Sequence, residues 1–340
     1  MQSLKILVGL GIFCGLVSCG SSGESKQLQS DKIVDGWDRL NGKWWLLPNL
    51  KDARVVLPDR PHSRSEIDSS HQGAAGLKRV REYRLTTSSL RLRGPELGAK
   101  KDGVVRIAAI GDSVTHGWGV TRAESYPAQL EQVLTQRGYA VEVINAGVPA
   151  NRLDTMEAWC RVIGNELEVD WVLWTRRPNA ALPNPTESYR RHLTECQRHT
   201  GAQVMVVLPP ISTFDPRGIR NYKREGQGLR QALGDQIRVL ELTDVFHEAQ
   251  EGRGEVLIQA DGKQRVVDQE SGAVWMEADA PLNSGQQQPT PALNPKIYTL
   301  FEAESEVREA LFFDEGHPDA EGFELFAATV ADAWVAELQP

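Results

Sequence analysis

The sequence predicts an α/β fold in which helices cover both faces of a central parallel sheet. Two observations support this prediction. From Gly103 onward, short apolar segments alternate with amphipathic segments of helical length, which is the pattern of a parallel sheet with crossover helices. The chain has 340 residues, of which 40% are hydrophobic and 25% charged. One α/β domain of about 200 to 250 residues with attached segments accounts for that length and composition.

The expected elements alternate along most of this region. The expected strands are 104–110, 141–144, 171–174, 204–208 and 239–242. The expected helices are 125–137, 153–167, 187–199 and 320–338. The first of these helices illustrates the evidence, because Leu130, Val133 and Leu134 recur at the spacing of one helix face.

Three segments lie outside this alternation. Residues 34–102 have an irregular pattern with Trp37, Trp44 and Trp45, and we expect an N-terminal extension whose tryptophans pack on the main domain, 103–340. Within that domain, residues 251–300 break the alternation. We interpret them as an inserted β-excursion that acts as a lid or substrate-side loop.

The amino terminus has the pattern of an export signal. Lys5 precedes an apolar run over residues 6–17, which is too short to span a bilayer. The run ends in Leu-Val-Ser-Cys19 followed by Gly-Ser-Ser-Gly. This resembles a bacterial lipoprotein signal, which implies removal of residues 1–18, attachment of lipid such as palmitate to Cys19, and a flexible tether over 19–33. An ordinary secretory signal or a buried helix is the alternative.

The lipoprotein resemblance implies a cell-envelope protein, lipid-anchored to a bacterial membrane and facing the periplasm or the exterior. Cys160 and Cys196 would then lie in an oxidising compartment. They form either a disulfide or two separate thiols, and consecutive crossover helices would place both on the same face of the sheet. The net charge of −8 disfavours nucleic-acid binding. No CxxC or HExxH spacing for a metal occurs.

Two short motifs contain side chains suited to nucleophilic catalysis. Ser113 follows the first strand in the triplet Gly-Asp-Ser, and Asp314 and His317 precede the last helix in Asp-Glu-Gly-His-Pro. A serine hydroxyl needs an imidazole to take its proton, and a carboxylate that orients the imidazole improves the transfer. Ligands of open α/β sheets bind at the carboxyl ends of the strands, so these motifs can meet there. His116 is close to Ser113 in sequence, and we expect it to be an exposed residue near the cleft.

These motifs resemble those of the SGNH hydrolases, also called the GDSL esterases and lipases, over about residues 104–338. The resemblance implies a flavodoxin-like three-layer sandwich and a catalytic triad of Ser113, His317 and Asp314, with no cofactor and no metal. It also implies an oxyanion hole that includes the backbone N–H groups of Ser113 and Gly147, the latter in the segment Asn-Ala-Gly.

The third family motif is altered in this chain. After the strand at 171–174 the sequence reads Thr-Arg-Arg-Pro-Asn-Ala, where the family has a glycine-containing block with a functional asparagine. The resemblance places Asn179 at that asparagine, as the third oxyanion donor. Pro178 fixes φ and lacks an N–H, so this loop differs from the family pattern.

The motifs together lead us to expect a membrane-anchored extracytoplasmic serine ester hydrolase. The expected substrate is an O-acyl, for example acetyl, ester of a glycan or cell-wall polymer. One alternative is an O-acyltransferase that uses the same triad to acylate a sugar hydroxyl. The other alternative, suggested by the altered third motif, is a surface binding protein with a degenerate site.

Overall fold

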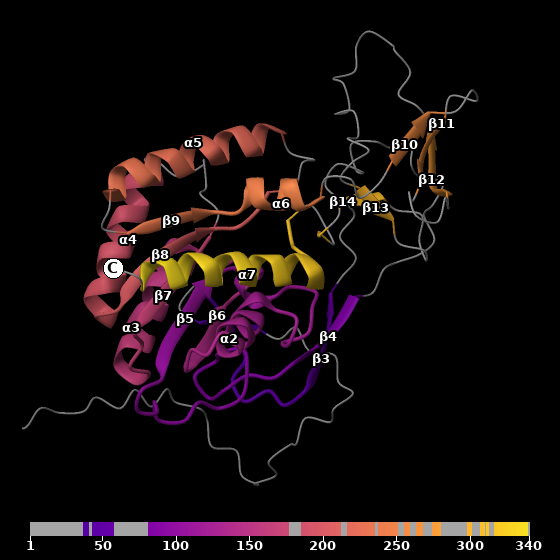
Figure 1. Ribbon diagram of the computed structural model, residues 1–340. Helices are drawn as coiled ribbons and strands as arrows, with labels where there is room; N and C mark the ends of the chain where they lie inside the picture. Colours follow the sequence, from indigo (N-terminus) through magenta and orange to yellow (C-terminus); the bar gives the residue numbers. More distant parts are fainter. Residues whose placement is uncertain are drawn as a thin grey trace, which may run out of the picture.

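A five-stranded parallel sheet forms the centre of the molecule in the computed structural model (Figure 1). Its strand order is β6-β5-β7-β8-β9, which numbers 2-1-3-4-5 in chain order and is the flavodoxin-like order. The strands are β5 (Val105–Gly111), β6 (Val141–Gly147), β7 (Trp171–Thr175), β8 (Gln203–Leu208) and β9 (Arg238–Glu241). All four pairings are parallel. The predicted fold class is therefore confirmed.

The structure describes most of the chain from residue 37 onward. The described residues are 37–40, 43–57, 81–176, 185–211, 216–234, 237–250, 255–258, 263–267, 274–279, 298–300, 307–309, 311–312 and 316–338. Within this part of the chain, no helix combines the length and apolarity needed to cross a membrane.

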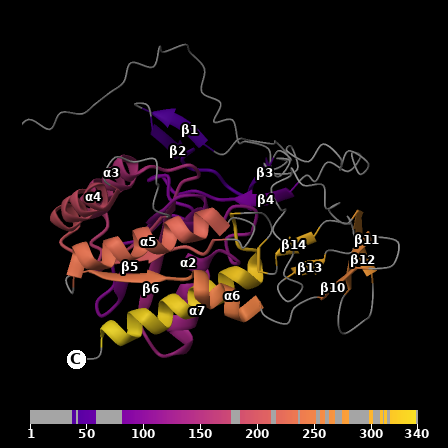
Figure 2. The same cartoon turned by 90° about the horizontal axis from the view of Figure 1, so that it is seen from above.

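Helices cover both faces of the sheet, as Figure 2 shows from above. One face carries α3 (Leu153–Glu166), α4 (Pro185–Thr200) and α5 (Pro216–Leu233). The other face carries α2 (Tyr126–Gln136), α6 (Thr243–Gln250) and α7 (Ala320–Glu337). Alternate residues of β5 point to opposite faces, so that Ala108 and Ile110 join the apolar cluster under α3 and α4, while Ile107 and Ala109 join the cluster under α2 and α7.

Two of these helices, α5 and α6, were not among the expected elements. α5 contains glycines at 218, 226 and 228, which lower helix propensity. At Gly226 a Cβ would lie 3.1 Å from Leu208 Cδ1 of β8, so the glycine allows the helix to lie close to the sheet. Packing on the sheet stabilises α5 where the local sequence alone predicts a weak helix.

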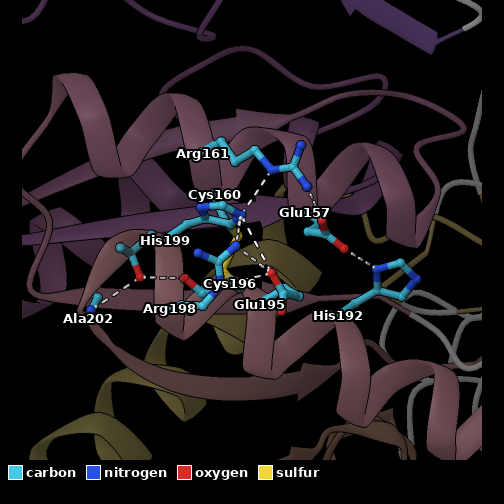
Figure 3. Close-up of a disulfide and its surroundings, with 10 residues drawn as sticks. Glu157, Cys160, Arg161, His192, Glu195, Cys196, Arg198, His199 and Ala202 are labelled. Atoms are coloured by element: carbon cyan, nitrogen blue, oxygen red, sulfur yellow. Dashed lines mark hydrogen bonds and ion pairs between the residues drawn. A yellow bond between two sulfur atoms is a disulfide. The ribbon is translucent and has the colours of Figure 1, made fainter.

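A disulfide joins α3 to α4 on their shared face of the sheet (Figure 3). Cys160 and Cys196 are both fully buried, with Cα atoms 5.1 Å apart. Of the two alternatives that the sequence left open, the structure contains the disulfide. α3 connects β6 to β7 and α4 connects β7 to β8, and both helices lie on one face, as expected for consecutive right-handed crossovers in this strand order.

The N-terminal extension contains two antiparallel hairpins that its irregular pattern did not predict. β1 (Trp37–Leu40) pairs with β2 (Lys43–Leu46), and β3 (Ala53–Leu57) pairs with β4 (Arg81–Leu85). The Trp45 ring contacts that of Trp159 on α3, with the two ring centroids 4.9 Å apart. The side chains of Trp37 and Trp44 lie outside the described residues.

The insertion at 251–300 contains strands, in agreement with the expected β-excursion. β10 (Glu255–Ile258), β11 (Lys263–Val267) and β12 (Val274–Asp279) form an antiparallel sheet. β13 (Tyr298–Leu300) pairs with β14 (Val307–Glu309), so the strands continue beyond residue 300, where we expected the insertion to end. The β10–β12 sheet lies apart from the central sheet in both views (Figures 1 and 2). A lid role for the insertion stays a prediction.

Candidate active site

Ser113 lies at the carboxyl end of β5, as the first residue of the short helix α1 (Ser113–His116). Asp112 is the N-cap of this helix, and its carboxylate accepts a hydrogen bond of 3.1 Å from the Val114 N–H. A Cβ on Gly111 would overlap Thr115 Oγ1 and the Thr175 carbonyl. The glycine of the Gly-Asp-Ser triplet therefore allows the strand-to-helix turn, and the aspartate caps the helix that begins with the serine.

His317 brings its imidazole to this serine from the segment before α7. Its Nε2 lies 2.8 Å from Ser113 Oγ, although the two residues are 204 positions apart in the chain. The segment is fixed on its C-terminal side because Asp319 caps α7, accepting a hydrogen bond of 2.9 Å from the Gly322 N–H. The distance and the atoms are those required for proton transfer from a serine hydroxyl to a histidine base.

Three of the site residues expected from the sequence lie outside the described residues. These are Asp314, Asn179 and the lipidation residue Cys19. Their roles stay predictions, while the Ser113 and His317 side chains are in hydrogen-bonding contact.

Gly147 is close to α1, but its N–H, which we expected to be an oxyanion donor, is hydrogen-bonded within the protein. It donates a hydrogen bond of 3.0 Å to Oδ1 of Asn145, so this conformation does not offer it to an oxyanion. A Cβ at Gly147 would overlap the backbone N of His116. The structure thus explains the glycine by the close approach of α1 to β6, and an oxyanion role for its N–H requires Asn145 to release it.

A buried polar group lies beneath α1 and links four elements around the site. The Tyr126 hydroxyl of α2 lies 2.7 Å from Thr175 Oγ1 of β7 and 3.4 Å from Thr115 Oγ1 of α1. The Tyr126 ring stacks on Phe326 of α7, with centroids 4.3 Å apart. Burial raises the pKa of Tyr126 well above its usual value, so the hydroxyl keeps its proton for these contacts.

His116 is fully buried, and the expectation of an exposed residue near the cleft is wrong. Its Nδ1 lies 3.4 Å from the Gly147 carbonyl, and its Nε2 lies 2.9 Å from the Tyr83 hydroxyl. A carbonyl only accepts hydrogen bonds, so we assign the proton to Nδ1, and the Tyr83 hydroxyl donates to Nε2. Burial and the charge of Arg93 hold the pKa of His116 well below its usual value.

Residues of the N-terminal extension that the sequence analysis did not single out surround His116. Arg93 is 2% exposed, and its guanidinium donates to the carbonyls of His116, Gly117 and Val120. Burial lowers the pKa of Arg93 to about 10, so the group stays charged near neutral pH. A long-range contact between an arginine and backbone carbonyls has no local sequence signal, and only the tertiary structure reveals it.

Trp118 forms an aromatic border to the site. Its ring stacks on that of His317, with centroids 6.1 Å apart and an interplanar angle of 29°. Trp118 also packs against the apolar cluster of the β3–β4 hairpin, which contains Leu50, Val55 and Leu85. The extension therefore contacts the Trp118 side chain that stacks on His317.

One group of metal-ligating side chains lies away from this site, among the described residues near the disulfide (Figure 3). Ligand atoms of Glu157, Glu195 and His199 lie within 4.8 Å of one another. Arg161 pairs with Glu157 at 2.6 Å, and Arg198 pairs with Glu195 at 2.7 Å. Arg161 Nε also donates to His199 Nε2. The two guanidinium groups already occupy these ligand atoms, so we assign no metal to them.

Replacing His116 with Gln should reduce the loss of stability in mild acid. The unfolded chain binds a proton on His116 near pH 6.5, whereas the folded chain resists it. Below about pH 6.5 this group should therefore cost the wild type up to about 1.4 kcal/mol of unfolding free energy per pH unit. Gln can still accept from Tyr83 but does not titrate. Urea unfolding at about pH 7.5 and pH 5.5 measures the effect, and parallel losses in both proteins would contradict it.

Comparison with known proteins gives structural similarity without a sequence match. No family model matches the chain, and no curated protein does. A G-D-S-L family lipolytic protein from Desulfitobacterium hafniense is 17% identical, with 67% of this chain and 98% of that chain covered at a TM-score of 0.39. One from Veillonella parvula is 14% identical, with 68% and 98% covered at 0.42. An esterase from Pseudoalteromonas is 12% identical, with 69% and 99% covered at 0.40.

The similar solved structures thus include members of the family that the motifs resemble. The activity of this chain is inferred from the residues of its own site.

Proposed function

We propose that this protein is a serine ester hydrolase in which Ser113 is the nucleophile, His317 the general base and Asp314 the residue that orients His317. The observation that supports it is the 2.8 Å contact between His317 Nε2 and Ser113 Oγ. The two side chains come from the carboxyl end of β5 and from the turn before α7. Contact between distant segments at the ligand-binding edge of a parallel sheet is what a catalytic pair requires.

The proposed reaction proceeds through an acyl-enzyme. Ser113 Oγ attacks the ester carbonyl while its proton moves to His317 Nε2, which gives a tetrahedral oxyanion. The oxyanion collapses, the bond to the alcohol breaks, and His317 returns the proton to the leaving oxygen. A water molecule then attacks the acyl-Ser113 ester with His317 again as base, and the acid and free Ser113 hydroxyl are released.

The oxyanion needs hydrogen-bond donors, and we propose the Ser113 N–H and the Asn179 side-chain amide for this role. The Gly147 N–H would join them only if Asn145 released it from their 3.0 Å hydrogen bond. Loss of one oxyanion donor typically lowers turnover about 10²- to 10³-fold. If the altered third motif misplaces the Asn179 amide, turnover should fall by about this factor, while Ser113 and His317 still carry out the reaction.

The proposed substrate is an O-acyl ester, for example an acetyl ester, of a glycan or cell-wall polymer. A lipid anchor at Cys19 would hold the enzyme in the cell envelope, where such polymers occur. Transfer of the acyl group to a sugar hydroxyl uses the same first half-reaction. Incubation with an acylated glycan and a free glycan acceptor separates the two, because hydrolysis releases free acid and leaves the acceptor unmodified.

The experiment that tests the proposed activity combines a substrate with a covalent probe. The purified protein is assayed with a short-chain p-nitrophenyl ester and then treated with a serine-reactive phosphonate. We expect turnover, and a covalent adduct that peptide mapping locates on Ser113. Folded protein that neither turns over the ester nor reacts with the phosphonate would favour a binding protein with a degenerate site.

Replacing Cys19 with Ser should release the protein from membranes. The thiol is the proposed attachment point of the lipid, and without acyl chains the chain has no proposed anchor. Fractionation of cells that express each form measures the effect, with soluble Cys19→Ser and membrane-bound wild type as the expected result. Membrane retention of Cys19→Ser after a high-salt wash would count against the lipid anchor.

A further inference from the structure

The N-terminal extension reaches the carboxyl end of α1 through Arg93. The guanidinium donates to three carbonyls at and just after the end of α1, those of His116, Gly117 at 2.8 Å and Val120 at 2.7 Å. The last carbonyls of a helix have no partners within the helix, and in a helix of four residues they form a large share of all its backbone groups. The positive charge also lies at the end of the helix where a cation is favourable.

Tyr83 contacts the same turn through the side chain of His116. Its hydroxyl donates to His116 Nε2 at 2.9 Å, and its ring lies beneath the Arg93 guanidinium, 5.1 Å from the centroid. Burial raises the pKa of Tyr83 to about 12, so the hydroxyl keeps its proton near neutral pH and can donate it to His116. His116, the last residue of α1, is therefore held by its ring through Tyr83 and by its carbonyl through Arg93.

Both residues are themselves fixed by backbone pairing, Arg93 to β6 of the central sheet and Tyr83 within the β3–β4 hairpin. The Arg93 N–H donates to the Asn145 carbonyl at 3.0 Å, which makes an antiparallel bridge to β6. Tyr83 is 4% exposed and lies in β4, paired with Val55 of β3. Arg93 is thus tied directly to β6, the strand that pairs with β5 ahead of Ser113.

We propose that Tyr83 and Arg93 act as positioning residues for the Ser113 nucleophile, a pair that we call the extension clamp. α1 is fixed at its first turn by Asp112 and at its last residue by the clamp. A four-residue helix that loses one of these supports can shift relative to His317, and a displacement of about 1 Å is enough to cost about 10²-fold in rate. The inference rests on the proposed hydrolase function and makes the extension part of the active site.

The experiment compares Arg93→Lys and Tyr83→Phe with Arg91→Lys as a matched control. A lysine keeps the charge of Arg93 but lacks the planar fork that reaches three carbonyls. Tyr83→Phe keeps the ring beneath the guanidinium and removes only the hydroxyl. Arg91 belongs to the same segment and donates to the Leu46 carbonyl at 2.9 Å, so Arg91→Lys weakens a bond from a guanidinium to a backbone carbonyl that does not involve α1.

We expect Arg93→Lys to lower kcat by about 10- to 100-fold with little change in KM, and Tyr83→Phe to lower kcat by a smaller factor. The rate of phosphonate labelling of Ser113 should fall in parallel, and Arg91→Lys should keep both rates. All rates are measured at a temperature where circular dichroism shows each variant fully folded. This readout separates positioning from stability, because a merely structural role would lower the melting temperature and leave kcat of the folded protein unchanged.

Wild-type kcat in folded Arg93→Lys and folded Tyr83→Phe would overturn the clamp, as would an equal loss in Arg91→Lys. If Arg93→Lys does not fold, Tyr83→Phe decides in the same way, with wild-type kcat overturning the inference. A wild-type protein that shows neither ester turnover nor labelling would instead refute the proposed function, and the clamp with it.

Discussion

Replacing Ser113 with Ala should lower kcat on a p-nitrophenyl ester by roughly 10⁴- to 10⁶-fold, and replacing His317 with Ala should have an effect of the same order. Ala at 113 removes the oxygen that would form the acyl bond, so the two-step reaction has no first step. Ala at 317 leaves the hydroxyl without the Nε2 that lies 2.8 Å away. A serine hydroxyl without a base is a poor nucleophile near neutral pH.

The double variant Ser113→Ala/His317→Ala gives a sharper test of the pair. Residues that act as a unit are not additive, so the double variant should be about as slow as either single variant. His199→Gln is the matched control, because this histidine lies on α4 beside the disulfide, among the contacts shown in Figure 3. A loss in the double variant equal to the product of the single losses would contradict a joint role for Ser113 and His317.

The central sheet was predictable because each of its strands is a short apolar segment that can be recognised in the sequence. β7 and β8 are buried along almost their whole length, and a fully buried strand reads as a continuous apolar segment. The flavodoxin-like strand order was implied by the resemblance to the SGNH hydrolases, and with right-handed crossovers this order predicts α3 and α4 on one face. The β3–β4 hairpin of the extension packs a small apolar cluster of its own, and its sequence has too little periodicity to predict pairing.

The contact between Ser113 and His317 was predictable from the sequence, and the contacts that support α1 were not, for a physical reason. Ser113 and His317 are each marked by local motifs at a strand end and before a helix, where open α/β sheets place their ligands. Arg93 instead acts through backbone carbonyls of another segment, and every residue type offers a carbonyl. No pattern in either segment identifies such a contact. The burial of His116 could not be predicted for the same reason, because Tyr83 and Gly147 contact it only in the folded chain.

Removing the disulfide by the double substitution Cys160→Ala/Cys196→Ala should destabilise the protein by about 4 kcal/mol. The bond closes a loop with a sequence separation of 36 residues, and a cross-link of that length restricts the unfolded chain by about this amount in the chain-entropy account. Packing of α3 on α4 remains, because Trp159, Tyr189 and Leu193 stay in the buried cluster. We therefore expect a folded protein that unfolds at lower urea concentration.

Equilibrium unfolding in urea measures this difference, and reduced wild type is the matched control for the two missing sulfur atoms. The wild type unfolded in the presence of dithiothreitol should lie close to the double variant, because both lack the cross-link. Near-equal unfolding midpoints for oxidised and reduced wild type would contradict a stabilising role. We expect kcat of the folded double variant to stay at the wild-type level, because neither cysteine contacts Ser113 or His317 in the described structure. Stability and catalysis would then depend on separate parts of the fold, with the disulfide securing α3 to α4 and α1 carrying Ser113.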